Sequence, residues 1–212
     1  MAADDADPPR RRRLTTGRLE AFSDGVFAIA VTLLILDVAV PAGSGSDLLG
    51  AVGDQWPTYL AYLVSFSTIG AVWLAHSVIT EYLDRADAVF VRLNLLLLLV
   101  VSFLPFPTRL IAEYHAESSA ERVAVTIYGV NLLLASVLVA VLWRYAIREH
   151  LLRPDAGDDD VKLLTQRLTP GLAAYVVLIA MGLFLPAVAV IGYLVIAVYF
   201  IVPIRKIRHR QT

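Results

Sequence analysis

Five long apolar segments constrain this chain more than any other feature of its sequence. A helix that crosses the roughly 30 Å hydrocarbon core of a bilayer needs about 20 mostly apolar residues. The apolar segments lie at residues 18–40, 58–80, 88–104, 122–144 and 170–204. Hydrophobic residues make up 58% of the 212 and charged residues 17%, against about 45–50% and 25% in an ordinary soluble domain. The pattern excludes a disordered chain and predicts an all-α, polytopic membrane protein rather than a soluble enzyme.

The last apolar segment is too long for one crossing. It covers about 35 residues and contains Pro186 near its middle, and proline breaks a helix because it lacks an amide hydrogen. Two helices of about 17 residues that meet at Pro186 would each just span a bilayer. We therefore predict six transmembrane helices within residues 18–204, flanked by an N-terminal tail at 1–17 and a basic C-terminal tail at 205–212.

Basic residues are distributed unevenly about these helices. With six helices, 16 of the 18 Lys and Arg residues fall on one side, and only Arg109 and Arg122 fall on the other. Cytoplasmic loops of membrane proteins are enriched in Lys and Arg. The distribution predicts that both termini are cytoplasmic in a multi-pass protein of the plasma or inner membrane. Beside membrane spans, the basic clusters are better explained by topology and lipid headgroup contact than by nucleic-acid binding.

Two polar stretches are expected to be loops. The Gly- and Ser-rich residues 42–46 predict a flexible external loop, and the acidic run 158–160 predicts a solvated cytoplasmic linker. Neither stretch indicates a binding site.

Ionisable side chains inside the first apolar segment need an explanation, because burying a charge in a bilayer is costly. Arg18, Glu20 and Asp37 can reach headgroup level, whereas Asp24 lies deeper. Arg18 and Asp24 are six residues apart, about 240° around a helix, and cannot pair within it. Asp24 therefore requires a partner from another segment. His76, at a similar depth near the cytoplasmic end of the second helix, is the best candidate.

Further polar side chains occur at the same level. Trp73 shares a face with His76, and Asn94 enters with the third helix. A polar cluster is therefore expected at the inner membrane face, formed by Arg18, Ser23, Asp24, His76 and Asn94. A hydrogen-bond network that joins helices is the favoured interpretation. Direct contact with a transported ion is the alternative.

Beyond Asp24 the first helix is apolar on all sides, so its periodicity does not identify a pore-lining face. Steps of three or four residues define one stripe, which runs through Phe22, Gly25, Ile29, Thr32, Leu33 and Leu36. From the residues alone, this stripe is typical of packing against lipid or another helix.

The R-x-x-x-F-S-D motif of residues 18–24, followed by the apolar run 25–34, resembles the signature of the transmembrane protein 175 family of potassium channels. The similarity is to the single-repeat prokaryotic branch of that family. The pair Trp73 and His76, and Asn94 with the apolar run that follows it, also resemble the family. The resemblance covers about the first half of the chain, and the later helices match only in hydropathy and number.

The resemblance implies a homotetramer with a potassium-conducting central pore lined by the first helix of each subunit. It implies an apolar constriction at Ile29, with Thr32, Leu33 and Leu36 forming further rings toward the outside. Rings of this kind gate by dewetting. The remaining motif residues would hold the first helix against the second and third through His76 and Asn94; they are Arg18, Phe22, Ser23 and Asp24. Asp37 departs from the family pattern, and four copies of it would concentrate cations at the outer end.

The expected function is thus passive potassium conduction, with the permeant ion, other copies of the chain and the bilayer as partners. The chain has no Cys, and its four His lie in separate segments, so no enzyme activity, resident metal or cofactor is expected. The alternative is a proton-coupled secondary transporter that uses Asp24 and His76. Such transporters have paired repeats and broken helices at the bilayer midplane, and the sequence contains neither an evident repeat nor a break within the first helix.

Overall fold

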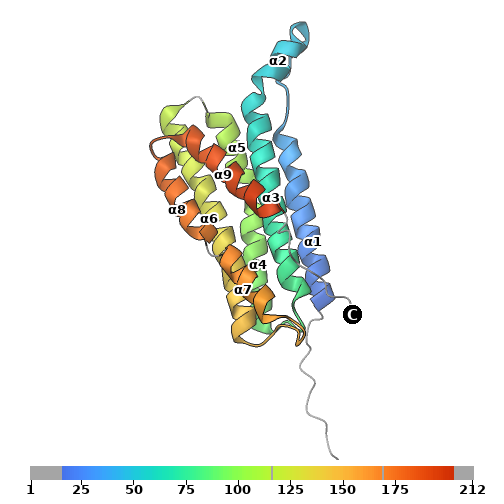
Figure 1. Cartoon of the computed structure of the whole chain (residues 1–212). Helices are drawn as coiled ribbons and strands as arrows, with labels where there is room; N and C mark the ends of the chain where they lie inside the picture. The colour runs from blue at the N-terminus through green and yellow to red at the C-terminus, as the bar shows by residue number, and fades with distance from the viewer. Residues whose placement is uncertain (1–15, 116, 169, 203–212) are drawn as a thin grey trace, which may run out of the picture.

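The computed structural model describes residues 16–115, 117–168 and 170–202, and this part of the chain is helical, as predicted (Figure 1). Two short 3-10 helices, η1 (Leu34–Asp37) and η2 (Ser44–Ser46), lie between the first two α-helices. The α-helices are α1 (Thr16–Leu33), α2 (Leu48–Asp54), α3 (Trp56–Glu81), α4 (Ala88–Phe103), α5 (Pro105–Tyr114), α6 (Ser118–Arg148), α7 (Asp158–Leu168), α8 (Pro170–Gly182) and α9 (Pro186–Ile201).

Five helical stretches in the described residues have the length and apolar composition needed to cross a membrane. They are Thr16–Asp37, Trp56–Glu81, Ala88–Tyr114, Ser119–Arg148 and Asp158–Gly182. α9, at 16 residues, is a shorter apolar helix. The chain is therefore a multi-pass membrane protein. The predicted break near Pro186 is confirmed, because α8 ends at Gly182 and α9 begins at Pro186.

Prolines and aspartates mark where several helices begin. Proline occupies the first turn of α3, α5 and α9, where its missing amide hydrogen costs no helical hydrogen bond. Asp87 begins α4 by accepting a hydrogen bond from the Phe90 amide at 2.7 Å. The third predicted span covered residues 88–104, but a new helix, α5, starts directly after it at Pro105. That span consequently extends to Tyr114.

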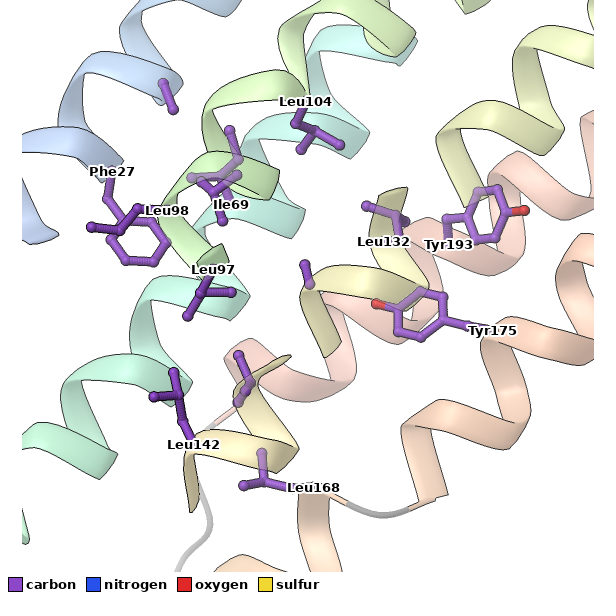
Figure 2. Packing of buried hydrophobic residues seen from close by; sticks show 14 of the residues in the cluster. Phe27, Ile69, Leu97, Leu98, Leu104, Leu132, Leu142, Leu168, Tyr175 and Tyr193 are labelled. Atoms are coloured by element: carbon purple, nitrogen blue, oxygen red, sulfur yellow. The ribbon is translucent and has the colours of Figure 1, made fainter. Parts of the chain in front are cut away.

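The helices form one bundle in which α3 has neighbours on several sides. α1 lies at one edge and packs against α3 and α4, while α9 crosses the bundle and packs against α3 and α8 (Figure 1). Buried side chains from α1, α4, α6 and α9 fill the core, including Phe27, Leu97, Leu142 and Tyr193 (Figure 2). Because α1 is at the edge, only one of its faces is covered within a single copy.

Two predictions about loops were wrong. Residues 42–46 are not simply a flexible loop, because they contain the whole of η2 and lead into α2, which projects beyond the end of the bundle (Figure 1). The acidic run 158–160 is the first turn of α7 and not a linker. Acidic side chains are favourable there because the amino end of a helix carries partial positive charge.

The α3–α4 and α6–α7 connections meet at the end of the bundle that lies opposite to α2. We call this the α3–α4 end. The Asp84 amide donates to the Leu151 carbonyl at 3.0 Å, and the Arg153 amide donates to the Tyr82 carbonyl at 2.9 Å. His150 adopts a positive φ of 52° in this joint. The basic residues at 10–13 and 205–210, which contribute to the predicted orientation, lie outside the described residues.

Candidate functional site: the first helix and the network behind it

α1 and η1 have one buried face. The buried residues recur every three or four positions, as one side of a helix requires; they are Leu19, Ser23, Phe27, Ala30 and Leu34. This face packs against α3 and α4. The helix is therefore held along its whole length from one side only.

The opposite face of α1 and η1 is open in a single copy. Phe22 is 57% exposed, Ile29 61%, Leu33 42% and Leu36 72%. Thr32 is exposed too, and its hydroxyl donates to the Ile29 carbonyl at 2.9 Å. An open apolar face of this size requires lipid or another protein surface to cover it.

A buried chain of hydrogen bonds connects α1 to α3 and α4. Nε2 of His76 in α3 lies 2.8 Å from Oδ1 of Asn94 in α4. The Asn94 amide donates to the Ser23 hydroxyl at 2.9 Å, and that hydroxyl donates to the Leu19 carbonyl at 2.9 Å. Ser23, His76 and Asn94 are all buried. The structure thus brings these three predicted cluster members together.

Asp24 has a different partner from the one expected. The Trp73 indole donates to Asp24 Oδ1 at 2.9 Å, whereas His76 bonds to Asn94. The prediction that His76 is the partner of Asp24 was wrong, because the rotation of α3 presents its indole to the carboxylate and turns its imidazole toward α4. The His76 ring packs instead against Phe27, with ring centroids 5.5 Å apart.

The other two motif residues lie outside this network. Arg18 is exposed and forms no ion pair with any residue that the structure describes. Phe22 lies on the open face of α1. In a single copy, the buried side of the motif therefore consists of Ser23 and, at its margin, Asp24.

Asp37 lies at the far end of the same helical stretch, beside a cavity of about 430 Å³. Asp54, Arg109 and Glu113 also line this cavity. Nε of Arg109 lies 2.7 Å from Oε1 of Glu113. Sequence reasoning did not pair these two residues, although their spacing of four on one helix is a signal for such an ion pair.

The described residues contain no cluster of three or more His, Cys, Asp or Glu side chains able to hold a metal ion. The polar groups of this site instead bond to each other and to the helix backbone. Their arrangement suits positioning of α1 more than ligation or acid–base chemistry.

Comparison with known proteins connects this arrangement to one family. The sequence pattern of the endosomal/lysosomal potassium channel TMEM175 family matches residues 18–105. A potassium channel of Streptomyces collinus is 37% identical over 187 residues, which cover 87% of this chain and 91% of that protein. The chain belongs to the TMEM175 family. A potassium channel of Chamaesiphon minutus is 39% identical over 189 residues, 87% of this chain and 93% of that one.

A solved TMEM175 structure has the same fold. The crystal structure of a lysosomal potassium-selective channel TMEM175 homolog from Chamaesiphon minutus superposes with a TM-score of 0.79 at 37% identity. The match covers 87% of this chain and 95% of that one. The predicted family membership is thereby confirmed. Since TMEM175 proteins are ion channels, the expectation that the chain is not an enzyme and uses no cofactor is confirmed as well.

Proposed function

We propose that this chain is a potassium-selective channel that conducts passively. Its relatives in Streptomyces collinus and Chamaesiphon minutus are named potassium channels, and each aligns over nearly its whole length. We place the protein in the cell membrane with both termini in the cytoplasm and with α8 and α9 as the fifth and sixth crossings. The distribution of the basic residues supports this orientation.

The functional unit in this proposal is a homotetramer with α1 of each copy around a central pore. One observation carries it. Ile29, Leu33 and Leu36, which the family resemblance assigns to the constriction, all lie on the face of α1 and η1 that a single copy leaves open. A face that was already packed against α3 or α4 would be unavailable to a pore.

Four copies of this face give a constriction of apolar rings. Ile29, Leu33 and Leu36 would line successive levels of the pore. Water leaves a narrow pore segment that is lined by apolar side chains, and ions cannot pass until that segment widens. Thr32 adds a hydroxyl at one level. Because that hydroxyl donates its hydrogen to the Ile29 carbonyl, its oxygen lone pairs remain available toward the pore.

The buried network then acts as the support of the pore helix. Ser23, His76 and Asn94 anchor α1 from behind, and Trp73 holds Asp24 beside them. At the other end, four copies of Asp37 would place negative charge at the outer mouth. A ring of carboxylates raises the local concentration of cations.

Potassium flux through Ile29 variants tests this proposal. We expect the purified chain in liposomes to dissipate a potassium gradient without a gradient of any second solute. Ile29→Ser should raise the flux and weaken discrimination against sodium, because it removes an apolar side chain from the constriction. Ile191→Ser in α9 is the matched control, since Ile191 is similarly exposed, at 56%, but lies far along the chain from α1.

Two outcomes would contradict the proposal. Equal flux and selectivity in Ile29→Ser and the unsubstituted chain would remove Ile29 from the constriction. Strict dependence of potassium movement on a proton gradient would instead indicate a proton-coupled transporter.

A further inference from the structure

One side of α6 carries an exposed apolar stripe whose length is close to the hydrocarbon thickness of a bilayer. From Val130 onward, every third or fourth residue along one side of this helix is an exposed valine or leucine: Val130, Leu134, Val137 and Val141. Val123, seven residues before Val130 and so on the same side, is exposed as well. Residues 123–143 of the helix are about 30 Å long at 1.5 Å per residue, which matches the hydrocarbon thickness of a bilayer. A bilayer in register with this stripe would place Arg122 and Arg144 at the two headgroup levels.

Two arginines continue this stripe at the α3–α4 end of the bundle. Arg144 and Arg148 are four residues apart, so they share one face of α6, and both are exposed. The side chain of Arg148 is 85% exposed. If lipid covers the apolar stripe directly above them, the two guanidinium groups are at the level of the headgroups.

The helical turn that carries Arg144 is fixed on both sides. The Trp143 indole donates to the Thr165 hydroxyl in α7 at 2.8 Å. The Tyr145 hydroxyl donates to Asp87 Oδ2 at 2.7 Å. These two bonds set the rotation of the α6 end, so that Arg144, which lies between the two aromatic residues, is directed away from the bundle.

The protein provides little negative charge for the two arginines. Asp87 uses one carboxylate oxygen for the Phe90 amide and the other for Tyr145. Arg148 has a loose contact with Glu149, Nε to Oε1 at 3.6 Å, which leaves its terminal nitrogens available. Arg144 forms no ion pair within residues 16–115, 117–168 and 170–202. Apart from the loose contact of Arg148 with Glu149, the two guanidinium groups thus have no carboxylate partner among the described residues.

We propose that Arg144 and Arg148 together bind the phosphate of an anionic phospholipid such as phosphatidylglycerol. Guanidinium groups bind phosphate through paired, planar N–H donors, and the lipid's acyl chains would lie along the valine and leucine stripe of α6. The site is in the leaflet at the α3–α4 end. Its assignment to the cytoplasmic leaflet rests on the orientation in the proposed function.

Native mass spectrometry of the full-length protein tests this site. The assembled protein is purified, equilibrated with equal amounts of phosphatidylglycerol and phosphatidylcholine, and analysed for retained lipid. We expect preferential retention of phosphatidylglycerol. Each Arg→Gln substitution should lower that preference about fivefold, since one basic residue at an anionic surface contributes on the order of 1 kcal/mol.

Three variants make the result specific. Arg122→Gln, at the opposite end of the same helix, should leave the preference unchanged. Arg144→Lys with Arg148→Lys should retain part of it, because lysine keeps the charge but not the planar pair of donors. Arg148→Gln decides the question by itself if the Arg144 variants do not assemble, because the Arg148 side chain is 85% exposed and its replacement does not disturb packing.

The site is contradicted if Arg144→Gln and Arg148→Gln each retain phosphatidylglycerol as well as the unsubstituted protein does. It is also contradicted if Arg122→Gln causes an equal loss, which would indicate annular lipid attracted by any arginine. The measurement involves no current, so a protein that binds the lipid but does not conduct potassium would contradict the proposed function and not this site.

Discussion

Nε2 of His76 lies 2.8 Å from Oδ1 of Asn94, and this bond is one step of a hydrogen-bond chain with a fixed direction. The Leu19 carbonyl can only accept, so the Ser23 hydroxyl donates to it and must accept from the Asn94 amide. The oxygen of Asn94 therefore faces the imidazole, and His76 carries its hydrogen on Nε2. Reversal of any one bond would leave another buried group unpaired.

We expect Asn94→Ala to destabilise the protein by about 3 kcal/mol, because it leaves the buried Nε2 of His76 without a partner and removes the hydrogen bond that the Ser23 hydroxyl accepts. Thermal unfolding of the purified protein in detergent measures the loss. Asn131→Ala is the control, since Asn131 makes only one described bond, to the Val100 carbonyl at 3.1 Å. A loss in Asn131→Ala as large as that in Asn94→Ala would show that the directional chain has no special role.

Trp73→Phe should loosen the attachment of α1, because it keeps an aromatic ring but removes the indole hydrogen that Asp24 accepts. Trp73 is 40% exposed, so we expect a modest loss of about 1 kcal/mol in the free energy of unfolding. Trp56→Phe is the matched control, at 61% exposure and without an indole hydrogen bond among the described residues. Equal unfolding midpoints for the two variants would argue against a role for the Trp73–Asp24 bond.

His150→Gly should stabilise the protein by about 0.5–1 kcal/mol. His150 has a φ of 52°, a backbone conformation that glycine adopts without the steric cost of a β-carbon. The neighbouring Glu149→Gly should have the opposite effect, because Glu149 has an ordinary φ of −91°. Chemical denaturation of the two variants compares them, and a decrease in stability of His150→Gly would contradict the expectation.

Asp87 should make the α3–α4 end sensitive to acid. Burial opposes ionisation of Asp87, but the hydrogen bonds that it accepts from Phe90 and Tyr145 outweigh this and hold its pKa below the usual 3.8. A lowered folded-state pKa adds stability that is fully present above the unfolded value and is lost as the pH falls through the folded value. The difference in stability between the unsubstituted chain and Asp87→Asn should therefore shrink below about pH 4.

Unfolding midpoints measured from pH 7 to pH 3 check this expectation. Tyr145→Phe serves as an intermediate case. It removes the side-chain hydrogen bond that lowers the Asp87 pKa and leaves the backbone hydrogen bond from Phe90 in place. A constant difference between the unsubstituted chain and Asp87→Asn across this pH range would show that Asp87 contributes no acid-dependent stability.

The membrane-spanning architecture could be predicted from the sequence because it depends on local properties. The length of an apolar run decides whether it can span a bilayer, and this located four of the candidate spans, although the third continues to Tyr114. The backbone chemistry of proline placed the break before Pro186. The third segment was predicted to end at residue 104, yet α5 begins at Pro105. A proline occurs both just after the end of a helix and in the first turn of a new one, so its position alone does not decide between the two.

The sequence predicted which residues of α1 form one stripe, but not that this stripe is exposed. Spacing alone places Ile29, Leu33 and Leu36 on one face of a helix. It does not say whether α3 and α4 cover that face, because α1 is apolar on all sides beyond Asp24. The answer required the packing of the bundle, in which the face centred on Phe27 is the buried one.

The sequence by itself determined the apolar helical segments, the family motif and the level along the helices at which the polar side chains Asp24, Trp73, His76 and Asn94 occur, since each follows from position along a helix. Only the tertiary structure decided which of them pair. Trp73 and His76 are only three residues apart, so the rotation of α3 against its neighbours decides their partners. The Trp73 indole bonds to Asp24, and the His76 imidazole bonds to Asn94. That rotation results from side-chain packing among several helices at once, and no periodicity within one helix specifies it.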